Sequence, residues 1–323
     1  MGRKKRGRDI DGIIVINKPL GLSSNQVLQR VKRIFNANKA GHTGALDPLA
    51  TGVLPICLGE ATKFSQLLLD ADKGYQTTAQ LGEVRTTGDA EGEVLEQYPL
   101  PALSDAKIAA VIEQHLGDIE QVPPMFSALK LNGQPLYKLA RQGMSAEEMQ
   151  AVADKKRRII TIRSLLLNGY TESAIDLSVI CSKGTYIRTL VEDMGKALGS
   201  GAYVSRLHRT LSAPFNSEHM MDLDQLQQEA EQDGYAALDQ YLLPLELAIP
   251  DDWPIVDISE ADCAAIRQGQ RIRTVAFDAG QSAIASVQLR AANLDGLPCI
   301  AIGRYQDGWI YPSRVLNRAQ LDS

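Results

Sequence analysis

Apolar and polar residues follow one another along this chain in patterns that predict both strands and helices. Strands are predicted by short apolar runs and by period-two alternation, at 12–17, 53–58, 73–81, 159–167 and 176–181. Helices are predicted where apolar residues recur at helical spacing, at 25–35, 59–69, 104–115 and 189–198. Ser23 or Ser24 can cap the first helix, and Ser104 the third, because serine hydroxyls accept hydrogen bonds from the free amides at a helix start. We therefore expect strands and helices to be mixed over most of the chain.

The C-terminal part of the chain has a different pattern. Residues 220–243 predict two acidic amphipathic helices, and Pro244, Pro250 and Pro254 then indicate a boundary. Beyond it, short strand-like segments are separated by turns, at 255–258, 269–272, 283–289, 299–305 and 309–312. We expect a small β domain over 251–318, after a larger domain over 9–250.

One stretch of the larger domain does not continue the pattern of strands and helices. Asn132-Gly133 favours a tight turn, and a short helix carrying Lys138 and Arg141 is predicted just after it. We therefore expect 124–150 to form an exposed, basic excursion from the core.

The net charge of −5 conceals segments of opposite sign. Counting Lys and Arg against Asp and Glu gives about +6 for 1–70, about −6 for 71–150, about +5 for 151–215 and about −10 for 216–323. Residues 1–8 are typical of a disordered basic arm. Positive segments can assemble into one basic face, so an acidic chain can still bind nucleic acid. A solvated face is the alternative interpretation of any single charged run.

Composition excludes several classes of protein. Apolar residues make up 44% and charged residues 23% of the chain, as in soluble globular proteins. The basic amino terminus is not followed by an apolar segment, and no stretch approaches the length of a membrane span, so we expect neither a secretory signal nor a membrane anchor. The 4 cysteines and 4 histidines are scattered, which indicates reduced thiols and no metal site. We expect a cytoplasmic protein.

The candidate chemistry lies in 41–52, with the sequence Gly-His-Thr-Gly-Ala-Leu-Asp-Pro-Leu-Ala-Thr-Gly. Glycines permit backbone shapes that other residues resist, and Pro48 restricts the residue before it to an extended conformation. Because an apolar strand follows, the stretch is interpreted as a shaped loop that aims His42 and Asp47 from the edge of a sheet. The alternative is an ordinary glycine-rich connection in which Asp47 is a turn residue.

The residue types in this loop limit its chemistry. It lacks the spacing of a phosphate-binding loop, one histidine and one aspartate are too few for a metal site, and no nucleophile elbow occurs. A single carboxylate that acts as nucleophile or base remains. A nearby arginine favours the anion, and Arg188 is the best candidate. Arg188 shares a face with Tyr186 if the chain there is extended, and the two diverge if a helix has begun. A surface salt bridge is the alternative for Arg188.

Together these segments resemble the TruB family of bacterial tRNA pseudouridine-55 synthases, over nearly the whole chain. The segments that carry the resemblance are 16–21, 23–24, 41–52, 59–63, 73–75, 123–130, 136–137, 140–143 and 181–189. The resemblance implies an α+β fold, in which a mixed, largely antiparallel central sheet is flanked by helices. It implies that 9–250 is the catalytic domain, that 124–150 closes over RNA and that 251–318 is a PUA-like RNA-binding domain.

The resemblance also implies roles for individual residues. Asp47 would attack the target nucleoside, at its base or at its sugar, with Arg188 as its partner. Tyr75 would stack on the extruded uracil and move its proton. Substrate contacts are implied for Tyr186 and Leu207 in the base pocket, for His42 inside the T loop, and for the basic Lys63.

The implied reaction turns uridine 55 in the T loop of tRNA into pseudouridine, as the uracil is released, rotated and rejoined through C5. It is an isomerisation, so no cofactor and no metal are expected. Extruding a base from a folded loop costs a few kcal/mol, and an aromatic ring beneath it returns roughly 1–3 kcal/mol. Stacking on the extruded base is therefore a physical reason for an aromatic residue at Tyr75, and packing in the core is the alternative. We expect a monomer whose partner is the T stem-loop of tRNA.

Two other functions fit the same residues. One is an RNA-folding chaperone that grips the T loop without chemistry, although Asp47 argues against this as the sole role. The other is a synthase that depends on a guide RNA and protein partners. The sequence of the 41–52 loop resembles the stand-alone bacterial type.

Overall fold

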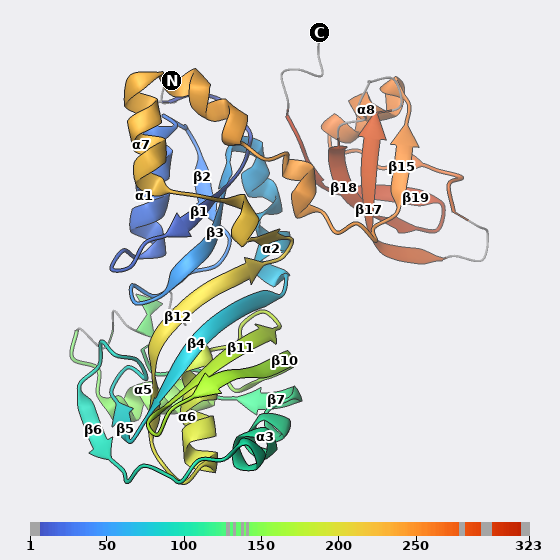
Figure 1. Ribbon diagram of the computed structural model, residues 1–323. Helices are drawn as coiled ribbons and strands as arrows, with labels where there is room; N and C mark the ends of the chain where they lie inside the picture. The colour runs from blue at the N-terminus through green and yellow to red at the C-terminus, as the bar shows by residue number, and fades with distance from the viewer. Residues whose placement is uncertain are drawn as a thin grey trace.

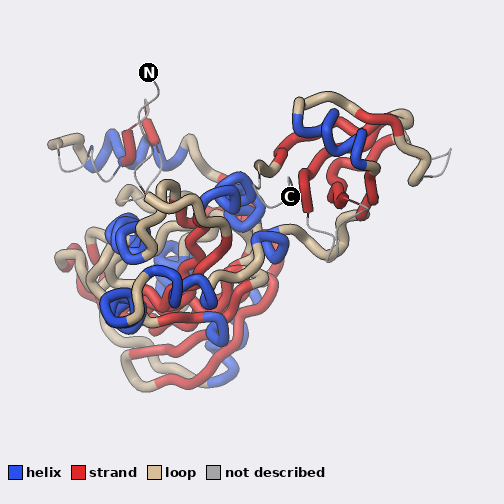
Figure 2. Tube along the Cα trace, turned by 90° about the horizontal axis from the view of Figure 1, so that it is seen from above, coloured by secondary structure: helices blue, strands red, loops and turns tan. Residues whose placement is uncertain are grey.

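The computed structural model describes residues 7–126, 130–131, 134–136, 139, 142–277, 282–291 and 299–317. A ten-stranded mixed sheet forms the larger body, and a five-stranded sheet near the C-terminus forms a separate lobe beside it (Figure 1). The view from above shows the small sheet as a lobe beside the larger body (Figure 2). The expected α+β fold with a separate small β sheet is confirmed.

The large sheet is built around a strand that the sequence did not indicate. That strand is β12 (Ala202–Ser212). The strand order of the sheet is β14 (Met220–Met221), β1 (Gly12–Lys18), β3 (Thr51–Leu58), β12, β4 (Lys73–Leu81), β11 (Ala174–Cys181), β10 (Arg158–Tyr170) and β7 (Gly117–Gln121). β12 runs parallel to β3 and antiparallel to β4, and so joins the two halves. The short strands β2 (Ala40–His42) and β13 (Phe215–Asn216) pair with β3 and β12. The connection from β2 to β3, which holds Asp47, therefore lies at the junction of the halves.

Helices cover the sheet in two groups, at opposite ends of it in Figure 1. α1 (Ser24–Ile34) and α7 (Leu223–Gln232) bury apolar residues against β1 and β3. α3 (Asp105–Gln114) and α6 (Ile187–Ala197) cover β4, β10, β11 and β12. Ser23 caps α1 in a capping box with Gln26, and Ser104 caps α3. Both caps were among those predicted.

Several predicted helices differ in extent or type. The predicted helix at 59–69 is a 3-10 helix, η1 (Gly59–Phe64), followed by α2 (Ser65–Asp70). The second acidic helix is also 3-10, η3 (Tyr235–Tyr241), and further short 3-10 turns are η2 (Ser217–His219) and η4 (Leu245–Ala248). α6 begins at Ile187, two residues before the predicted start.

The segment between β4 and β10 carries the smaller hairpins. β5 (Glu83–Arg85) and β6 (Val94–Gln97) form one of them, with a polar turn between them. The predicted basic excursion contains β8 (Lys130–Leu131), β9 (Gln134–Pro135) and α5 (Ala146–Asp154). The predicted turn at 132–133, most of the predicted helix at 136–142, and residues 1–6 of the basic arm lie outside the described residues.

The small sheet has the strand order β15 (Ile255–Ile258), β17 (Ala283–Ala291), β18 (Cys299–Gln306), β19 (Trp309–Val315) and β16 (Ile272–Arg273). α8 (Glu260–Arg267), which the sequence pattern did not indicate, packs on one face through Cys263 and Ile266. Ile302 of β18 and Leu316 belong instead to the apolar cluster around Phe64 of η1. The small sheet is therefore docked on the larger body.

Candidate functional site

The loop that carries Asp47 is fixed on both sides by the segment between β1 and α1. The buried hydroxyl of Ser24 accepts a hydrogen bond from the Leu46 amide at 2.7 Å and donates one to the Leu46 carbonyl at 3.1 Å. The Gly21 amide donates to the Pro48 carbonyl at 2.9 Å. The residues before and after Asp47 thus have fixed backbone positions, which orients the carboxylate between them.

Gly52 is needed where this loop enters β3. Its φ is +99°, in the region that favours glycine, and a Cβ there would lie 2.2 Å from the Arg209 carbonyl oxygen. The absence of a side chain lets β3 approach β12 closely. Arg209 of β12 therefore lies next to the loop.

Arg188, in the first turn of α6, is the cation that meets Asp47. Its Nη2 lies 3.0 Å from Asp47 Oδ2, and its Nη1 lies 3.8 Å from Asp89 Oδ2. Nη1 also donates to the Thr87 carbonyl at 2.7 Å, and Nη2 to the Phe126 carbonyl at 3.0 Å. The Arg188 and Asp89 side chains are 7% and 5% exposed, whereas that of Asp47 is 46% exposed. The buried Arg188 guanidinium is thus paired with the accessible carboxylate of Asp47.

Asp89 is a site residue that the sequence did not reveal. It lies in the turn between β5 and β6, where its Oδ1 accepts hydrogen bonds from the Thr87 hydroxyl and from the Glu91 amide. Arg85 holds this turn by donating to the Ala90 carbonyl at 3.3 Å. An aspartate in a polar turn is ordinary in a sequence, because turn aspartates commonly bond their own backbone.

Arg209 and Tyr75 form a second polar pair beneath the loop. Arg209 is 1% exposed, and it donates to the Val53 carbonyl at 2.7 Å and to the Gly44 carbonyl at 3.3 Å. It also hydrogen bonds with the Tyr75 side chain, across the register of β12 and β4. Burial raises the pKa of the Tyr75 hydroxyl, and the neighbouring Arg209 opposes this shift. The Tyr75 phenol is therefore protonated near neutral pH.

Leu207, a predicted pocket residue, and Tyr75 lie beside the Asp47 loop. Leu207 of β12 is buried in one apolar cluster with Leu46 and Ala50 of the Asp47 loop, and Tyr75 packs against that cluster. Tyr186 is the N-cap residue of α6. The helix has already begun at Arg188, so Tyr186 and Arg188 do not share one face of an extended segment, and the second of the two expected arrangements, in which they diverge, is the one found.

Lys18, which ends the apolar strand β1, is a second residue that sequence reasoning missed. Its side chain is completely buried, and its ammonium donates to the Pro19 carbonyl at 2.9 Å and to the Pro48 carbonyl at 3.4 Å. Burial lowers the pKa of Lys18 to about 8, although Asp47 acts in the opposite direction. A lysine in an otherwise apolar strand was the available signal.

His42 and Lys63 are placed differently from each other. Burial, with a smaller contribution from Arg209, lowers the pKa of His42, so its imidazole is neutral near pH 7. Lys63 lies at the junction with the small sheet, where its ammonium donates to Glu60 Oε2 at 2.6 Å and to the Val315 carbonyl at 2.7 Å. Lys63 thus links η1 to β19.

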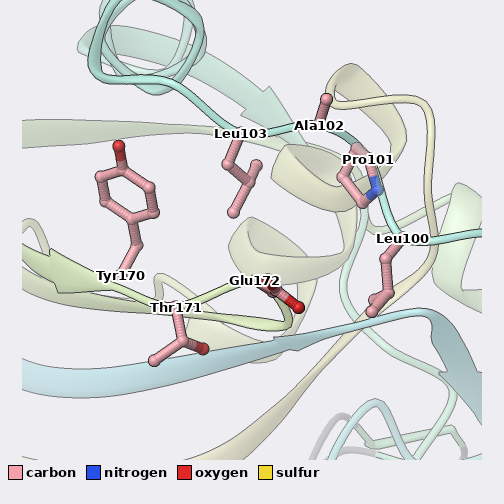
Figure 3. A pocket seen from close by; sticks show the side chains of 7 residues that line it. All are labelled: Leu100, Pro101, Ala102, Leu103, Tyr170, Thr171 and Glu172. Atoms are coloured by element: carbon pink, nitrogen blue, oxygen red, sulfur yellow. The ribbon is translucent and has the colours of Figure 1, made fainter.

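A surface groove elsewhere lacks comparable chemistry. It lies between the segment after β6 and the turn between β10 and β11 (Figure 3), and its lining residues are Leu100, Pro101, Ala102, Leu103, Tyr170, Thr171 and Glu172. None of them belongs to the Asp47 loop, to β4 or to α6.

Within the described ranges, no group of three or more His, Cys, Asp or Glu side chains is placed to hold a metal ion, and no helix is long and apolar enough to cross a bilayer.

Comparisons with known proteins point to one family. Residues 32–187 match the family model described as TruB family pseudouridylate synthase (N terminal domain), and residues 188–249 match tRNA pseudouridylate synthase B C-terminal domain. The tRNA pseudouridine synthase B of Marinomonas sp. is 47% identical over 98% of this chain and 99% of its own. That of Mannheimia succiniciproducens is 49% identical over 97% of this chain and 98% of its own.

Solved structures agree on the architecture. A crystal structure of a Cbf5-Nop10-Gar1 complex aligns with a TM-score of 0.70 and 26% identity, over 94% of this chain and 84% of that chain. The archaeal box H/ACA sRNP Nop10-Cbf5 complex aligns with a TM-score of 0.68 over 98% of this chain and 92% of that chain, and at 23% identity it supports the fold alone.

Proposed function

We infer that this chain, which belongs to the TruB family of pseudouridylate synthases, makes pseudouridine in tRNA. The two family matches and the 47% identity over 98% of the chain support this activity. We place the reaction at uridine 55 of the T loop. We also propose that the enzyme is cytoplasmic, because its substrate is tRNA, and that it acts as a monomer.

The observation that carries the mechanism is the pair formed by Asp47 and Arg188. The carboxylate is 46% exposed, while the guanidinium 3.0 Å away is almost completely buried. A buried cation that is held by backbone carbonyls fixes the position of the carboxylate that pairs with it. Asp47 therefore acts as the nucleophile, and Arg188 orients it.

The substrate base must leave the folded loop before the carboxylate can reach it. Tyr75 and Leu207 form the apolar surface beside Asp47 on which the extruded uracil stacks, and Tyr186 closes the pocket. The neutral ring of His42 fills the place that the base vacates. Lys63 contacts the RNA near the junction with the small sheet, where its ammonium is already bonded to Glu60.

The bond changes balance without an added reagent. The bond from N1 of uracil to C1′ of ribose breaks, and a bond from C5 to C1′ forms. The proton on C5 is lost, and N1 gains one. Asp47 starts the sequence by adding to the base or by attacking C1′, and the bond that it forms breaks again before the product leaves, which restores the free carboxylate. The protonated Tyr75 hydroxyl assists the proton movement.

The proposed function is tested by the substitution Asp47→Asn with an unmodified tRNA transcript. The amide keeps the size of the side chain and removes the nucleophile, so we expect at least a roughly thousandfold loss of pseudouridine formation with tRNA affinity retained. Pseudouridine mapping and a binding titration provide the two measurements. Retained isomerisation by this variant would overturn the mechanism.

The same experiment separates the alternatives. Loss of isomerisation with retained tRNA binding leaves a chaperone activity as a second role. The wild-type chain should modify the transcript with no other RNA or protein, and a requirement for added RNA and partners would support the guide-dependent alternative. The higher identity to the tRNA pseudouridine synthase B relatives, 47% against 26% for the Cbf5 structure, favours the stand-alone enzyme.

A further inference from the structure

Two residues at one edge of the large sheet contact the turn that leads into α6. Arg158 is the first residue of β10 and Gln121 is the last residue of β7, and the register of the two strands places them directly opposite one another. Side chains that are opposite across an antiparallel pair lie on the same face of the sheet. Both of these side chains reach residues 184–186, and this turn ends at Tyr186, the N-cap residue of α6.

The backbone of Tyr186 is fixed by Gln121. The Gln121 Nε2 donates to the Tyr186 carbonyl at 3.0 Å, and its Oε1 accepts from the Tyr186 amide at 2.8 Å. In the first turn of α6, the Thr189 hydroxyl donates to the carbonyl of Val122, the residue after Gln121, at 3.5 Å. These bonds attach the start of α6 to the end of β7, but they do not set the direction of the Tyr186 ring.

The ring of Tyr186 is contacted by Arg158. The guanidinium carbon lies 5.1 Å from the ring centre, which is within the range of a cation–π interaction. Arg158 Nη2 donates to the Gly184 carbonyl, so the same guanidinium is also attached to the backbone of the turn. Arg158 Nε is buried and has no hydrogen-bond acceptor among the residues that the structure describes. Packing against the turn and the ring therefore places this atom.

Gly184 leaves room for the guanidinium. Its φ is +79°, in the region that favours glycine, and a Cβ there would lie 3.1 Å from the Arg158 guanidinium carbon. A side chain at this position would push the guanidinium away from the turn. The glycine therefore lets Arg158 lie close to the backbone of the turn and to the Tyr186 ring at the same time.

Arg158 differs from its neighbour Arg157 in the group that it pairs with. Arg157 Nη1 lies 2.6 Å from Glu120 Oε1, in an ion pair whose two side chains are about half exposed. Arg158 forms no ion pair with any residue in the described part of the chain. A flat guanidinium can stack on a ring and donate hydrogen bonds in its own plane, whereas an ammonium cannot do both. The contacts of Arg158 thus require an arginine and not only a positive charge.

We propose that Arg158 is a positioning residue of the base pocket, which holds the Tyr186 ring in the direction that closes the pocket over the extruded uracil. This rests on the proposed function, in which Tyr186 lies at that pocket. Arg158 acts through the ring and makes no contact with the RNA. A displaced ring orients the uracil less well toward Asp47, so the rate falls while the affinity for the whole tRNA is kept.

The test replaces Arg158 in the full-length chain, as Arg158→Met, which keeps an unbranched side chain and removes the guanidinium. We expect a roughly tenfold lower rate of single-turnover pseudouridine formation at saturating enzyme, with tRNA affinity within about threefold of wild type. The dependence of that affinity on salt concentration should not change. Arg157→Met, at the neighbouring exposed arginine, is the matched control and should keep the wild-type rate.

Two further variants separate positioning from charge. Arg158→Lys keeps the charge and loses the flat group, so we expect its rate to stay at least about fivefold below wild type. In a Tyr186→Leu background, adding Arg158→Met should change the rate less than about twofold, because both substitutions remove the same contact.

A wild-type rate for Arg158→Met, a wild-type rate for Arg158→Lys, or an undiminished loss in the Tyr186→Leu background would overturn the proposal. So would a fall of about one in the slope of the logarithm of tRNA affinity against the logarithm of salt concentration, which would indicate a phosphate contact. Should Arg158→Met fail to fold, the rate of Arg158→Lys decides.

A crystal structure of Arg158→Met tests the position of the ring without an activity measurement. We expect the Tyr186 ring to move by about 1 Å or more, while the two bonds from Gln121 keep the start of α6 in place. An unmoved ring would overturn the proposal, whatever the activity of the enzyme. A wild-type chain that binds tRNA and makes no pseudouridine would instead refute the proposed function, and the crystal structure would still test whether Arg158 holds the ring.

Discussion

The role of Asp89, the second carboxylate beside Arg188, can be tested by the substitution Asp89→Asn. The amide has the shape of the carboxylate, so its oxygen can still accept hydrogen bonds from the Thr87 hydroxyl and the Glu91 amide. What is lost is the negative charge 3.8 Å from Arg188 Nη1. Arg188 would then keep its ion pair with Asp47, and Glu91 and Glu192 would be its remaining acidic neighbours.

The size of this effect follows from the geometry. Two unit charges at this separation interact by about 4 kcal/mol when the effective dielectric constant is about 20. This is an upper value, because the asparagine retains a dipole and the carbonyls of Thr87 and Phe126 still hold the guanidinium. A displacement of about 1 Å at a reacting group can cost about a hundredfold in rate. We expect pseudouridine formation to fall about ten- to hundredfold.

The assay is single-turnover pseudouridine formation at saturating enzyme, together with a titration of tRNA binding. Glu93→Gln is the matched control, because it makes the same chemical change at an exposed position in the same hairpin. We expect the control to keep the wild-type rate and both variants to bind tRNA normally. A rate for Asp89→Asn within twofold of wild type would refute the idea that Asp89 positions Arg188.

Three further predictions address other parts of the molecule. Tyr75→Phe keeps the ring and should retain more single-turnover activity than Tyr75→Leu, which loses roughly 1–3 kcal/mol of stacking; equal rates would exclude stacking. Burial lowers the pKa of the Lys73 amine to about 8, so the unfolded chain binds the extra proton above that pH. In urea unfolding, wild type should therefore gain up to about 1 kcal/mol per pH unit over Lys73→Met between pH 8 and 10, and parallel pH curves would contradict this. Lys63→Met removes the bond to Val315, so limited proteolysis should cleave near 249–255 faster than in wild type; an unchanged cleavage rate would show that Lys63 does not hold the lobes together.

The strands that sequence reasoning identified differ in their regularity from β12, the long strand that it missed. β1, β3 and β4 have continuous apolar runs or strict alternation, which periodicity detects. β12 has register shifts between Val204 and Arg206 and between Arg209 and Leu211, and such bulges interrupt the alternation. Arg209 also disguises the strand, because a fully buried arginine is rare and the pattern treats it as surface. The central strand of the sheet was therefore the hardest to predict.

The residues of the candidate site also divide into those that the sequence indicated and those that it did not. Asp47 lies in a loop of unusual composition, which makes it a candidate, but composition leaves an ordinary turn aspartate as the alternative and the family resemblance was needed to choose between them. Asp89, Lys18 and Arg209 each belong to an ordinary local pattern, a polar turn or a strand, and only tertiary packing gives them importance. Their partners lie far away in the chain, as with Arg209 and the Val53 carbonyl, 156 positions apart. Local propensity has no information about contacts of this kind.

Three buried cations, Lys18, Arg188 and Arg209, lie near the Asp47 carboxylate, and the charge of the proposed substrate gives a reason for them. Electrostatic interactions join three acidic and three basic side chains among the described residues, namely Asp47, Asp89, Glu91, Lys18, Arg188 and Arg209. A nucleophilic carboxylate must be anionic, yet its proposed substrate is a polyanion that an acidic cluster would repel. The buried cations beside these carboxylates reduce the negative charge that the approaching RNA meets. Removing any one of the cations should therefore disturb both the carboxylate and the approach of the RNA, whereas removing a distant surface charge should affect binding alone.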